Sequence, residues 1–187
     1  MGNPKPLRTA SILSLLAVLT ACADSASQGD AAGAAGAQGL SCAPGAAPTE
    51  PTARLIVDPR TVEYAPELGV DFANMVATPE GLFCVDLVVG DGAVAGPRST
   101  VNVHYTGALA DGTVFDDSRE RGQPFPFILG TASVIPGWDI GVMGMREGGR
   151  RLLVVPSELA YGPEGAGDGV IPPNAVLVFD VEVVQVN

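Results

Sequence analysis

Aromatic and branched apolar side chains recur in the second half of this 187-residue chain and could together line an apolar pocket. They fall in five short motifs from Val103 onward, in the order VHYTG, GTVFDDSRERGQPFPFILG, VIPGWDIGVMGM, ELAYG and VIPPNAVLVFDVEV. Rings bury large areas in any domain, so each of them alone is also a credible core residue. Together they place apolar groups where a proline-containing peptide could be gripped.

The chemistry open to such a pocket is rotation about the amide bond that precedes a proline. This rotation is slow because the amide has partial double-bond character, which gives a barrier of about 18–20 kcal/mol. The twisted transition state is less polar than the planar amide, so a dry apolar pocket favours it over the ground state. We expect no cofactor, covalent nucleophile or metal, since the sequence has no C-x-x-C pair and a single histidine, His104.

In their order and content the five motifs resemble the FKBP-type peptidyl-prolyl cis/trans isomerases, over residues 81–187. The resemblance implies an α+β fold in which an antiparallel β-sheet wraps around one short helix. It implies catalytic roles for Tyr105, Asp116, Ile135 and Tyr161. It also implies a substrate-binding surface, floored by Trp138 and completed by Phe115, Arg121, Phe125, Val134, Val170, Ile171 and Phe179.

The resemblance further implies how polar groups orient the substrate. The backbone N–H of Ile135 and the hydroxyl of Tyr161 are expected to donate hydrogen bonds to peptide carbonyls. Pro136 disfavours the helical region for the residue before it, which would aim that N–H outward. The carboxylate of Asp116 is expected near the rotating carbonyl, held there by Tyr105 and Arg121. Expected ligands are proline-containing unfolded or partly folded polypeptides and macrolide inhibitors.

Some features lie outside this pattern or depart from it. The loop Gly162–Gly169 is one residue longer than in compact family members and lacks a histidine often found there, which leaves substrate preference open. No chaperone domain is inserted between Phe125 and Val134. We interpret His104 as an exposed strand residue and Asp117 as a solvated carboxylate, because each alternates with a residue assigned to the site.

The elements that must position these residues are mostly strands. Alternating apolar residues in turn-bounded runs predict a first strand from about Gly81 to Gly90. Further strands are expected over Thr100–Leu109, Thr113–Asp116, Phe125–Leu129, Arg150–Pro156 and Ala175–Val186. Apolar residues at helical spacing predict one helix over Gly137–Met145, with Pro136 at its start, where a missing N–H costs least.

The N-terminus has the features of a bacterial secretory signal. Lys5 and Arg8 precede an apolar run, Ile12–Ala21, which is too short for a stable transmembrane helix. The run ends in Leu-Thr-Ala-Cys, which looks like a lipobox, so residues 1–21 are predicted to be removed and Cys22 to carry lipid. The domain would then sit at the cell envelope outside the cytoplasmic membrane, touching lipid only through this anchor. The alternative is an ordinary cleaved signal.

Two segments connect this signal to the domain. Residues 22–53 are rich in Ala and Gly with few large apolar groups, which predicts a flexible tether. Residues 54–80 regain apolar content, and Leu68, Val70 and Phe72 alternate at a strand period. We expect this second segment, the arm, to pack on the domain; the alternative is that it binds a partner.

With Cys22 assigned to lipid, Cys42 and Cys84 form an even pair in an oxidising compartment, so a disulfide between them is plausible. Cys84 is expected to face outward, because it alternates with Val85 and Leu87 in the first strand. Two free thiols remain the alternative.

A net charge of -11 makes nucleic acid an unfavourable partner. The favoured function is an enzyme that speeds proline-limited folding of exported proteins. Alternatives are a non-catalytic module or chaperone that holds proline-containing segments in the same pocket, and a surface protein that engages envelope partners through the arm.

Overall fold

A computed structural model of the chain describes Cys42 and residues 51–187. The predicted signal peptide, the lipidation site Cys22 and nearly all of the tether lie outside the described residues. Within the described part, no helix is both long and apolar enough to cross a bilayer.

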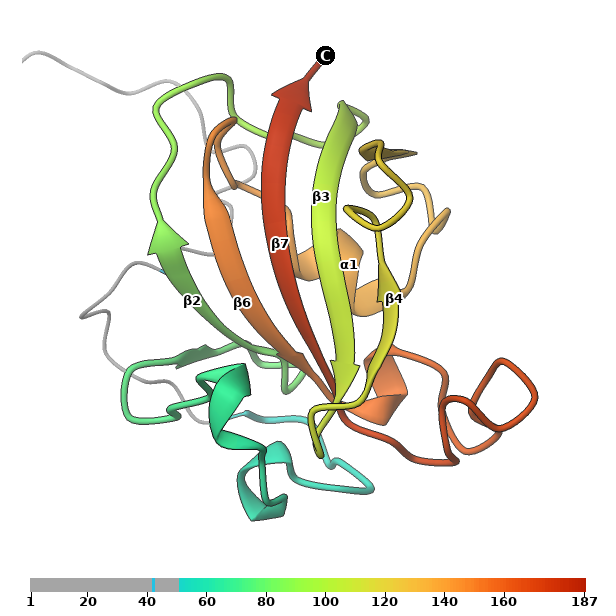
Figure 1. Cartoon of the computed structure of the whole chain (residues 1–187). Coiled ribbons are helices and arrows are strands. Elements are labelled where there is room, and N and C mark those ends of the chain that lie inside the picture. Colours follow the sequence, from blue (N-terminus) through green and yellow to red (C-terminus); the bar gives the residue numbers. More distant parts are fainter. Residues whose placement is uncertain (1–41, 43–50) are drawn as a thin grey trace, which may run out of the picture. The chain divides into compact units, whose positions relative to one another are not determined.

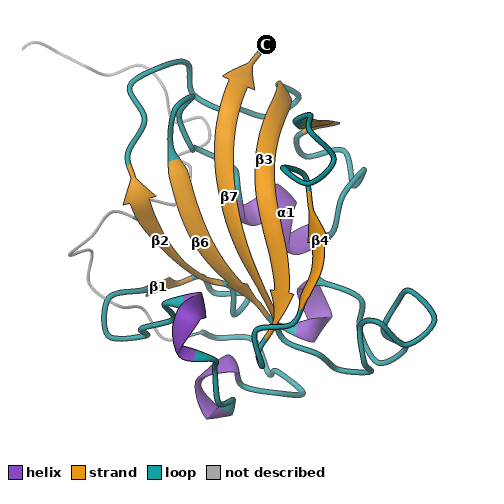
Figure 2. Cartoon of the chain, in the orientation of Figure 1, coloured by secondary structure: helices purple, strands orange, loops and turns teal. Residues whose placement is uncertain are grey.

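One antiparallel β-sheet organises the described residues (Figure 1). Its strands are β1 (Val76–Ala77), β2 (Phe83–Val88), β3 (Thr100–Leu109), β4 (Val114–Asp117), β5 (Phe125–Ile128), β6 (Arg150–Val155) and β7 (Leu177–Val186). Their order is β1-β2-β6-β7-β3-β4, and β5 pairs with β3. A short helix, α1 (Pro136–Gly141), lies against one face of the sheet (Figure 2). The predicted α+β fold class is confirmed.

Strand β3 lies between β7 on one side and β4 and β5 on the other. The alternating burial of its side chains explains why this strand could be predicted from the sequence. Val101, Val103 and Tyr105 are buried, while Asn102 and His104 between them are only partly covered. Successive side chains of a strand point to opposite faces, so every second residue enters the core on the α1 side.

Helix α1 ends at Gly141, short of the predicted end at Met145. The backbone beyond it is used by a neighbouring loop: the N–H of Gly144 donates to the carbonyl of Ala95, and the N–H of Ala95 donates to the carbonyl of Met145. Gly144 also has a φ of 79°, which no right-handed helix allows. Val142 and Met145 are nevertheless buried, so the apolar spacing reflected burial beyond the helix itself.

The opposite face of the sheet is covered by the arm. It contains two short 3₁₀ helices, η1 (Pro59–Thr61) and η2 (Pro66–Leu68), and a third, η3 (Ser157–Leu159), follows β6 (Figure 2). Phe72 packs edge-on against Phe83 with ring centroids 4.9 Å apart, and Tyr64 packs against Phe72 at 5.7 Å. These contacts belong to a second apolar cluster, separate from the one around α1.

Cys42 and Cys84 form a disulfide with their Cα atoms 5.6 Å apart. The predicted outward orientation of Cys84 is wrong, because both cysteines are fully buried in the cluster on the α1 side. Phe83 and Val85 take the face covered by the arm instead. The carbonyl of Cys42 also accepts from the N–H of Asp86, so the tether is fastened to the edge of β2.

Candidate active site

A cavity of about 280 Å³ opens beside α1 and gathers most of the predicted site residues. Its lining consists of Tyr105, Phe115, Asp116, Phe125, Ser133, Val134, Ile135, Trp138, Tyr161 and Phe179. Apart from Ser133, every one of these residues was assigned to the site from the sequence.

The floor of the cavity is Trp138, which is only 4% exposed. Its ring meets those of Tyr105, Phe127 and Phe179 with centroids 4.8, 5.6 and 5.5 Å away, and the contacts with Tyr105 and Phe179 are edge-to-face. Edge-to-face packing is favourable for aromatic quadrupoles, so each ring fixes the orientation of its neighbours. The floor of the cavity is therefore apolar and closely packed.

Gly137 lets the floor approach the sheet. A Cβ at this position would lie 2.4 Å from Cγ1 of Val155 on β6, a distance that side chains do not tolerate. The first turn of α1 therefore packs directly on β6 and holds Trp138 at the base of the cavity.

Ile135 presents a free backbone donor at the rim. It caps α1 with φ -59° and ψ 145°, the extended geometry expected before a proline, and Pro136 starts the helix. The carbonyl of Ile135 accepts from the N–H of Trp138 at 2.9 Å, whereas its own N–H donates to no other group among the described residues. Its side chain lines the cavity beside Val134.

The loop that leads to Ile135 is held by Asp139, which the sequence reasoning missed. The Asp139 carboxylate on α1 accepts from the N–H of Gly130 at 2.8 Å and from the N–H of Ala132 at 3.1 Å. Ala132 has a φ of 54°, which is unfavourable for a residue with a Cβ. Two hydrogen bonds to a charged acceptor offset that strain and fix the approach to the rim.

A cluster of polar side chains lies on the part of the cavity wall formed by β3 and β4. The hydroxyl of Tyr105 donates to Asp116, one guanidinium nitrogen of Arg121 pairs with the same carboxylate, and the other donates to the Tyr105 hydroxyl at 2.9 Å. Burial and the hydrogen bond to Asp116 raise the pKa of Tyr105 to about 12. Burial, followed by the charge of Asp116, also raises the pKa of Tyr161. Both phenols therefore remain protonated donors at neutral pH.

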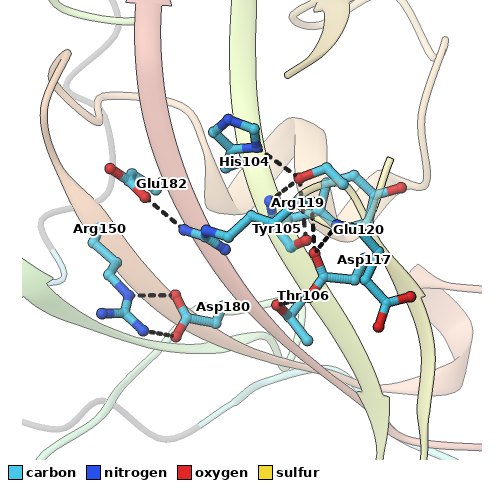
Figure 3. A network of polar contacts seen from close by, with 10 residues as sticks. His104, Tyr105, Thr106, Asp117, Arg119, Glu120, Arg150, Asp180 and Glu182 are labelled. Carbon is cyan, nitrogen blue, oxygen red and sulfur yellow. Dashed lines mark hydrogen bonds and ion pairs between the residues drawn. The ribbon is translucent and has the colours of Figure 1, made fainter. Parts of the chain in front are cut away.

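Strand β4, which carries Asp116, is bonded to β3 by side chains on the face of the sheet away from the cavity. Oγ of the buried Ser118 accepts from the N–H of Tyr105 at 2.8 Å, and Oγ1 of Thr106 donates to Asp117 at 2.7 Å (Figure 3). Asp117 also accepts from the N–H of Arg119, so it caps the following turn and is not the freely solvated carboxylate we expected.

His104 differs from its expected exposed state as well. It is half-buried, and its Nδ1 lies 3.0 Å from Oγ of Ser118 (Figure 3). On the same outer face, Arg119 pairs with Glu182, and Arg150 forms a two-pronged ion pair with Asp180. These contacts brace the sheet on the side away from the cavity.

Three residues predicted to bind substrate do not line the cavity. Arg121 acts on it only through Asp116 and Tyr105. Val170 is 55% exposed on the loop after Tyr161, and Ile171 is buried in the core, where it pairs with Ala166. Side chains alternate along this bridged segment, so adjacent residues could not both face the cavity.

Ser133 is the lining residue that the sequence did not suggest. Its Oγ lies 3.2 Å from the carbonyl of Ile128 and 3.3 Å from Oγ1 of Thr131, so the side chain is fastened within its own loop. Its position directly before Val134 and Ile135 was the available signal, since a chain that delivers two rim residues must pass beside the pocket.

Residues 92–184 match the protein family described as FKBP-type peptidyl-prolyl cis-trans isomerase. An FK506-binding protein of Neisseria meningitidis serogroup B is 52% identical over 106 residues, which are 57% of this chain and 96% of that protein. FK506-binding protein 2 of Yarrowia lipolytica is 59% identical over 88 residues, 47% of this chain and 60% of that one.

Solved structures show the same similarity. FkpA from Escherichia coli aligns with a TM-score of 0.56 at 42% identity, over 60% of this chain and 51% of FkpA. AtFKBP13 aligns with the same TM-score and identity, over 59% of this chain and 97% of AtFKBP13. The arm, residues 54–80, lies outside the stretch matched by the family.

Proposed function

The chain belongs to the FKBP-type peptidyl-prolyl cis-trans isomerases, and we propose that it accelerates proline-limited folding of exported proteins at the bacterial cell envelope. The observation that supports this site is the ring-walled cavity over Trp138, beside the N–H of Ile135, which has no partner among the residues that the structure describes. The proposed clients are unfolded or partly folded polypeptides that contain X–Pro bonds.

In this mechanism the proline ring rests on Trp138 and the preceding carbonyl rotates toward Asp116. The walls exclude water, so the less polar twisted amide is favoured over the planar one. No bond to the protein forms or breaks. The rate gain comes from binding the half-rotated amide more tightly than either planar isomer.

The polar groups orient the peptide. The N–H of Ile135 donates to a peptide carbonyl next to the proline, and the Tyr161 hydroxyl, on a side chain 40% exposed at the rim, donates to another. The Asp116 carboxylate acts electrostatically on the rotating group, and Tyr105 and Arg121 hold it in place as hydrogen-bond donors.

Two observations support a location outside the cytoplasm. The Cys42–Cys84 disulfide is of a kind that persists in oxidising compartments. The basic, apolar and Leu-Thr-Ala-Cys features of residues 1–22 favour export and acylation at Cys22. Acyl chains on Cys22 would hold the enzyme at the membrane while the domain remains in water.

A protease-coupled isomerisation assay tests the activity. The substrate is a short peptide with leucine before proline, and the wild-type chain is compared with Trp138→Ala and Asp116→Ala, with and without FK506. We expect wild-type turnover that FK506 inhibits, and a large loss in both variants. A wild-type protein that binds the peptide without speeding its interconversion would instead be a non-catalytic binding module.

Localisation needs a separate test. Expression in a bacterial host fed a radiolabelled fatty acid should label the wild-type protein and leave Cys22→Ser unlabelled. Label in neither protein would remove the anchor from the proposal and leave the isomerase activity untouched.

A further inference from the structure

A buried ion pair lies between the sheet and helix α1. Arg151 on β6 stands directly opposite Asp86 on the neighbouring strand β2 (Figure 1). The Arg151 side chain is only 3% exposed and that of Asp86 11%. Among the residues that the structure describes, no other charged residue is buried to the same degree as Arg151. Neither member of the pair lines the cavity over Trp138, so the isomerisation mechanism leaves the pair without a role.

The guanidinium of Arg151 joins three elements of the fold. Nε and Nη2 donate to the two carboxylate oxygens of Asp86 at 2.6 and 3.2 Å. Nη1 donates to the carbonyl of Gly141, the last residue of α1, at 2.7 Å. The last carbonyls of a helix have no partner within the helix, so this bond satisfies one of them. The planar fork of arginine allows all three contacts at once.

Strand β6 contacts α1 at three successive positions on the face that carries the cavity. Val155 packs against Gly137. Leu153 packs against Gly141, where an added Cβ would lie 2.8 Å from each of the two Leu153 methyl carbons. Apolar contacts are non-directional, so these two do not by themselves fix the position of the helix along β6. The third contact, from Arg151 to the Gly141 carbonyl, is a directional hydrogen bond that fixes where the helix ends.

Trp138 depends on this anchor, because it lies on the same short helix. Helix α1 has only 6 residues, and a helix of that length is not stable by itself in water. Its direction is therefore set by the groups that it contacts. Trp138 precedes Gly141 by less than one helical turn, and its indole is the floor of the cavity. A shift at the end of α1 would tilt that floor.

The other end of the ion pair is held at the edge of the sheet. The N–H of Asp86 donates to the carbonyl of Cys42 at 2.8 Å, and Cys42 is covalently bonded to Cys84 on the same strand. The carboxylate is therefore fixed in place before it meets Arg151. A fixed acceptor orients the guanidinium toward α1.

Stability alone does not explain a buried ion pair at this position. Taking two charges out of water is costly, and well-packed apolar residues in place of such a pair are often equally or more stabilising. Apolar residues cannot, however, bond a backbone carbonyl. We propose that Arg151, oriented by Asp86, is a positioning residue for isomerisation, which holds the end of α1 so that Trp138 lies where the proline ring binds. The inference rests on the proposed use of the cavity over Trp138.

The first test replaces the pair by apolar residues. The double variant Asp86→Leu, Arg151→Met removes both charges together, so neither is left buried without a partner. We expect its denaturation midpoint to stay close to that of the wild type, while kcat/KM on a short proline peptide falls about tenfold. The matched control is Asp180→Leu, Arg150→Met, which removes the neighbouring ion pair on the outer face of the sheet. It should leave kcat/KM unchanged.

Fluorescence gives a second measurement, because Trp138 is the single tryptophan of the chain. In the apolar double variant we expect acrylamide to quench Trp138 more strongly than in the wild type, and FK506 to bind severalfold more weakly. Arg151→Lys provides the same measurements with the positive charge beside Asp86 retained. One ammonium group cannot bond both the carboxylate and the Gly141 carbonyl as the guanidinium does, so we expect intermediate changes.

Wild-type kcat/KM and wild-type quenching in a folded double variant would overturn the inference. A loss of kcat/KM that only follows a loss of stability, with quenching unchanged in both variants, would also overturn it, because the pair would then serve the fold alone. Quenching needs no catalysis and so separates this inference from the proposed function. A wild-type chain without isomerase activity would remove that function, whereas stronger quenching in the variants would still show that Arg151 positions the floor.

Discussion

Arg121 contacts Tyr105 in two ways at the edge of the catalytic cavity. Its guanidinium carbon lies 5.5 Å from the centroid of the tyrosine ring, and Nη2 donates to the tyrosine hydroxyl at 2.9 Å. The second guanidinium nitrogen pairs with Asp116. A side chain that is itself 46% exposed thus positions two residues of the cavity wall.

The planar fork of Arg121 predicts that lysine cannot replace it. A single ammonium group cannot bond the Asp116 carboxylate, bond the Tyr105 hydroxyl and stack on the ring together. We expect Arg121→Lys to lower kcat/KM about three- to tenfold, since the cluster is partly screened by solvent. Arg119→Lys is the control, because Arg119 pairs with Glu182 on the outer face. Equal rates for the two variants would contradict the positioning role.

The raised pKa of Tyr105, about 12, predicts a loss of stability in alkali. The folded protein holds this proton more tightly than the unfolded chain does, whose tyrosine pKa is about 10. The stabilisation is therefore complete below pH 10 and is lost as the pH rises toward 12. Denaturant unfolding at stepped pH should show a smaller alkaline loss in Tyr105→Phe than in the wild type. Equal losses of stability in the two proteins would contradict the prediction. Tyr64, whose pKa is also raised, is present in both proteins and so cannot cause a difference between them.

Motif order and strand period made most of the site predictable. Tyr105 on β3, Asp116 on β4 and Trp138 on α1 all line the cavity. Alternation along β3 directs Tyr105, and Pro136 at the start of α1 sets the geometry of Ile135. Asp139 escaped prediction, since a carboxylate that bonds a loop to a helix leaves no periodic signal.

The errors arise from contacts between segments that are distant in sequence. Alternation along β2 says that Cys84 and Val85 point to opposite faces, but it does not say which face is covered when the arm covers one and α1 the other. Likewise the end of α1 depends on the distant Ala95, whose bonds to Gly144 and Met145 no local pattern reveals.

The disulfide predicts a large stability difference between oxidised and reduced protein. Cys42 and Cys84 are separated by 42 residues in sequence. Closing a loop of that length should stabilise the folded state by about 4 kcal/mol through the unfolded chain. We expect Cys42→Ala to unfold at correspondingly lower denaturant with kcat/KM on a short peptide unchanged, because neither cysteine lines the cavity. A difference below about 1 kcal/mol would contradict the covalent constraint.

Asp139 predicts a loosened rim when its carboxylate is removed. Asp139→Ala leaves the N–H groups of Gly130 and Ala132 without their acceptor. Amide hydrogen exchange over residues 130–135 should accelerate, and KM should rise more than kcat falls. Glu147→Ala is matched, since that carboxylate accepts from the N–H of Val186, away from the cavity. We expect Glu147→Ala to lower the free energy of unfolding and to leave KM unchanged. A similar change of KM in both variants would show that Asp139 stabilises the fold without positioning the rim.

The close packing around Gly107 predicts that the cavity wall does not tolerate a side chain at this position. It lies on β3 opposite Phe179, and a Cβ there would come within 2.8 Å of atoms in both the Phe115 and Phe179 rings. These rings meet edge-on with centroids 5.7 Å apart, so Gly107→Ala must separate them and deform the wall. We expect a stability loss of about 1–3 kcal/mol, as for other overpacked cores.

The deformed cavity wall of Gly107→Ala should also lower catalytic activity. We expect kcat/KM for Gly107→Ala to drop about tenfold, or about 1.4 kcal/mol of transition-state binding, at a temperature where the variant is folded. Gly96→Ala is the control, because its added Cβ would approach only Ser99 Oγ, at 3.8 Å. Full activity in a folded but destabilised Gly107→Ala would mean that the Phe115 and Phe179 rings serve the core and not the rotating amide.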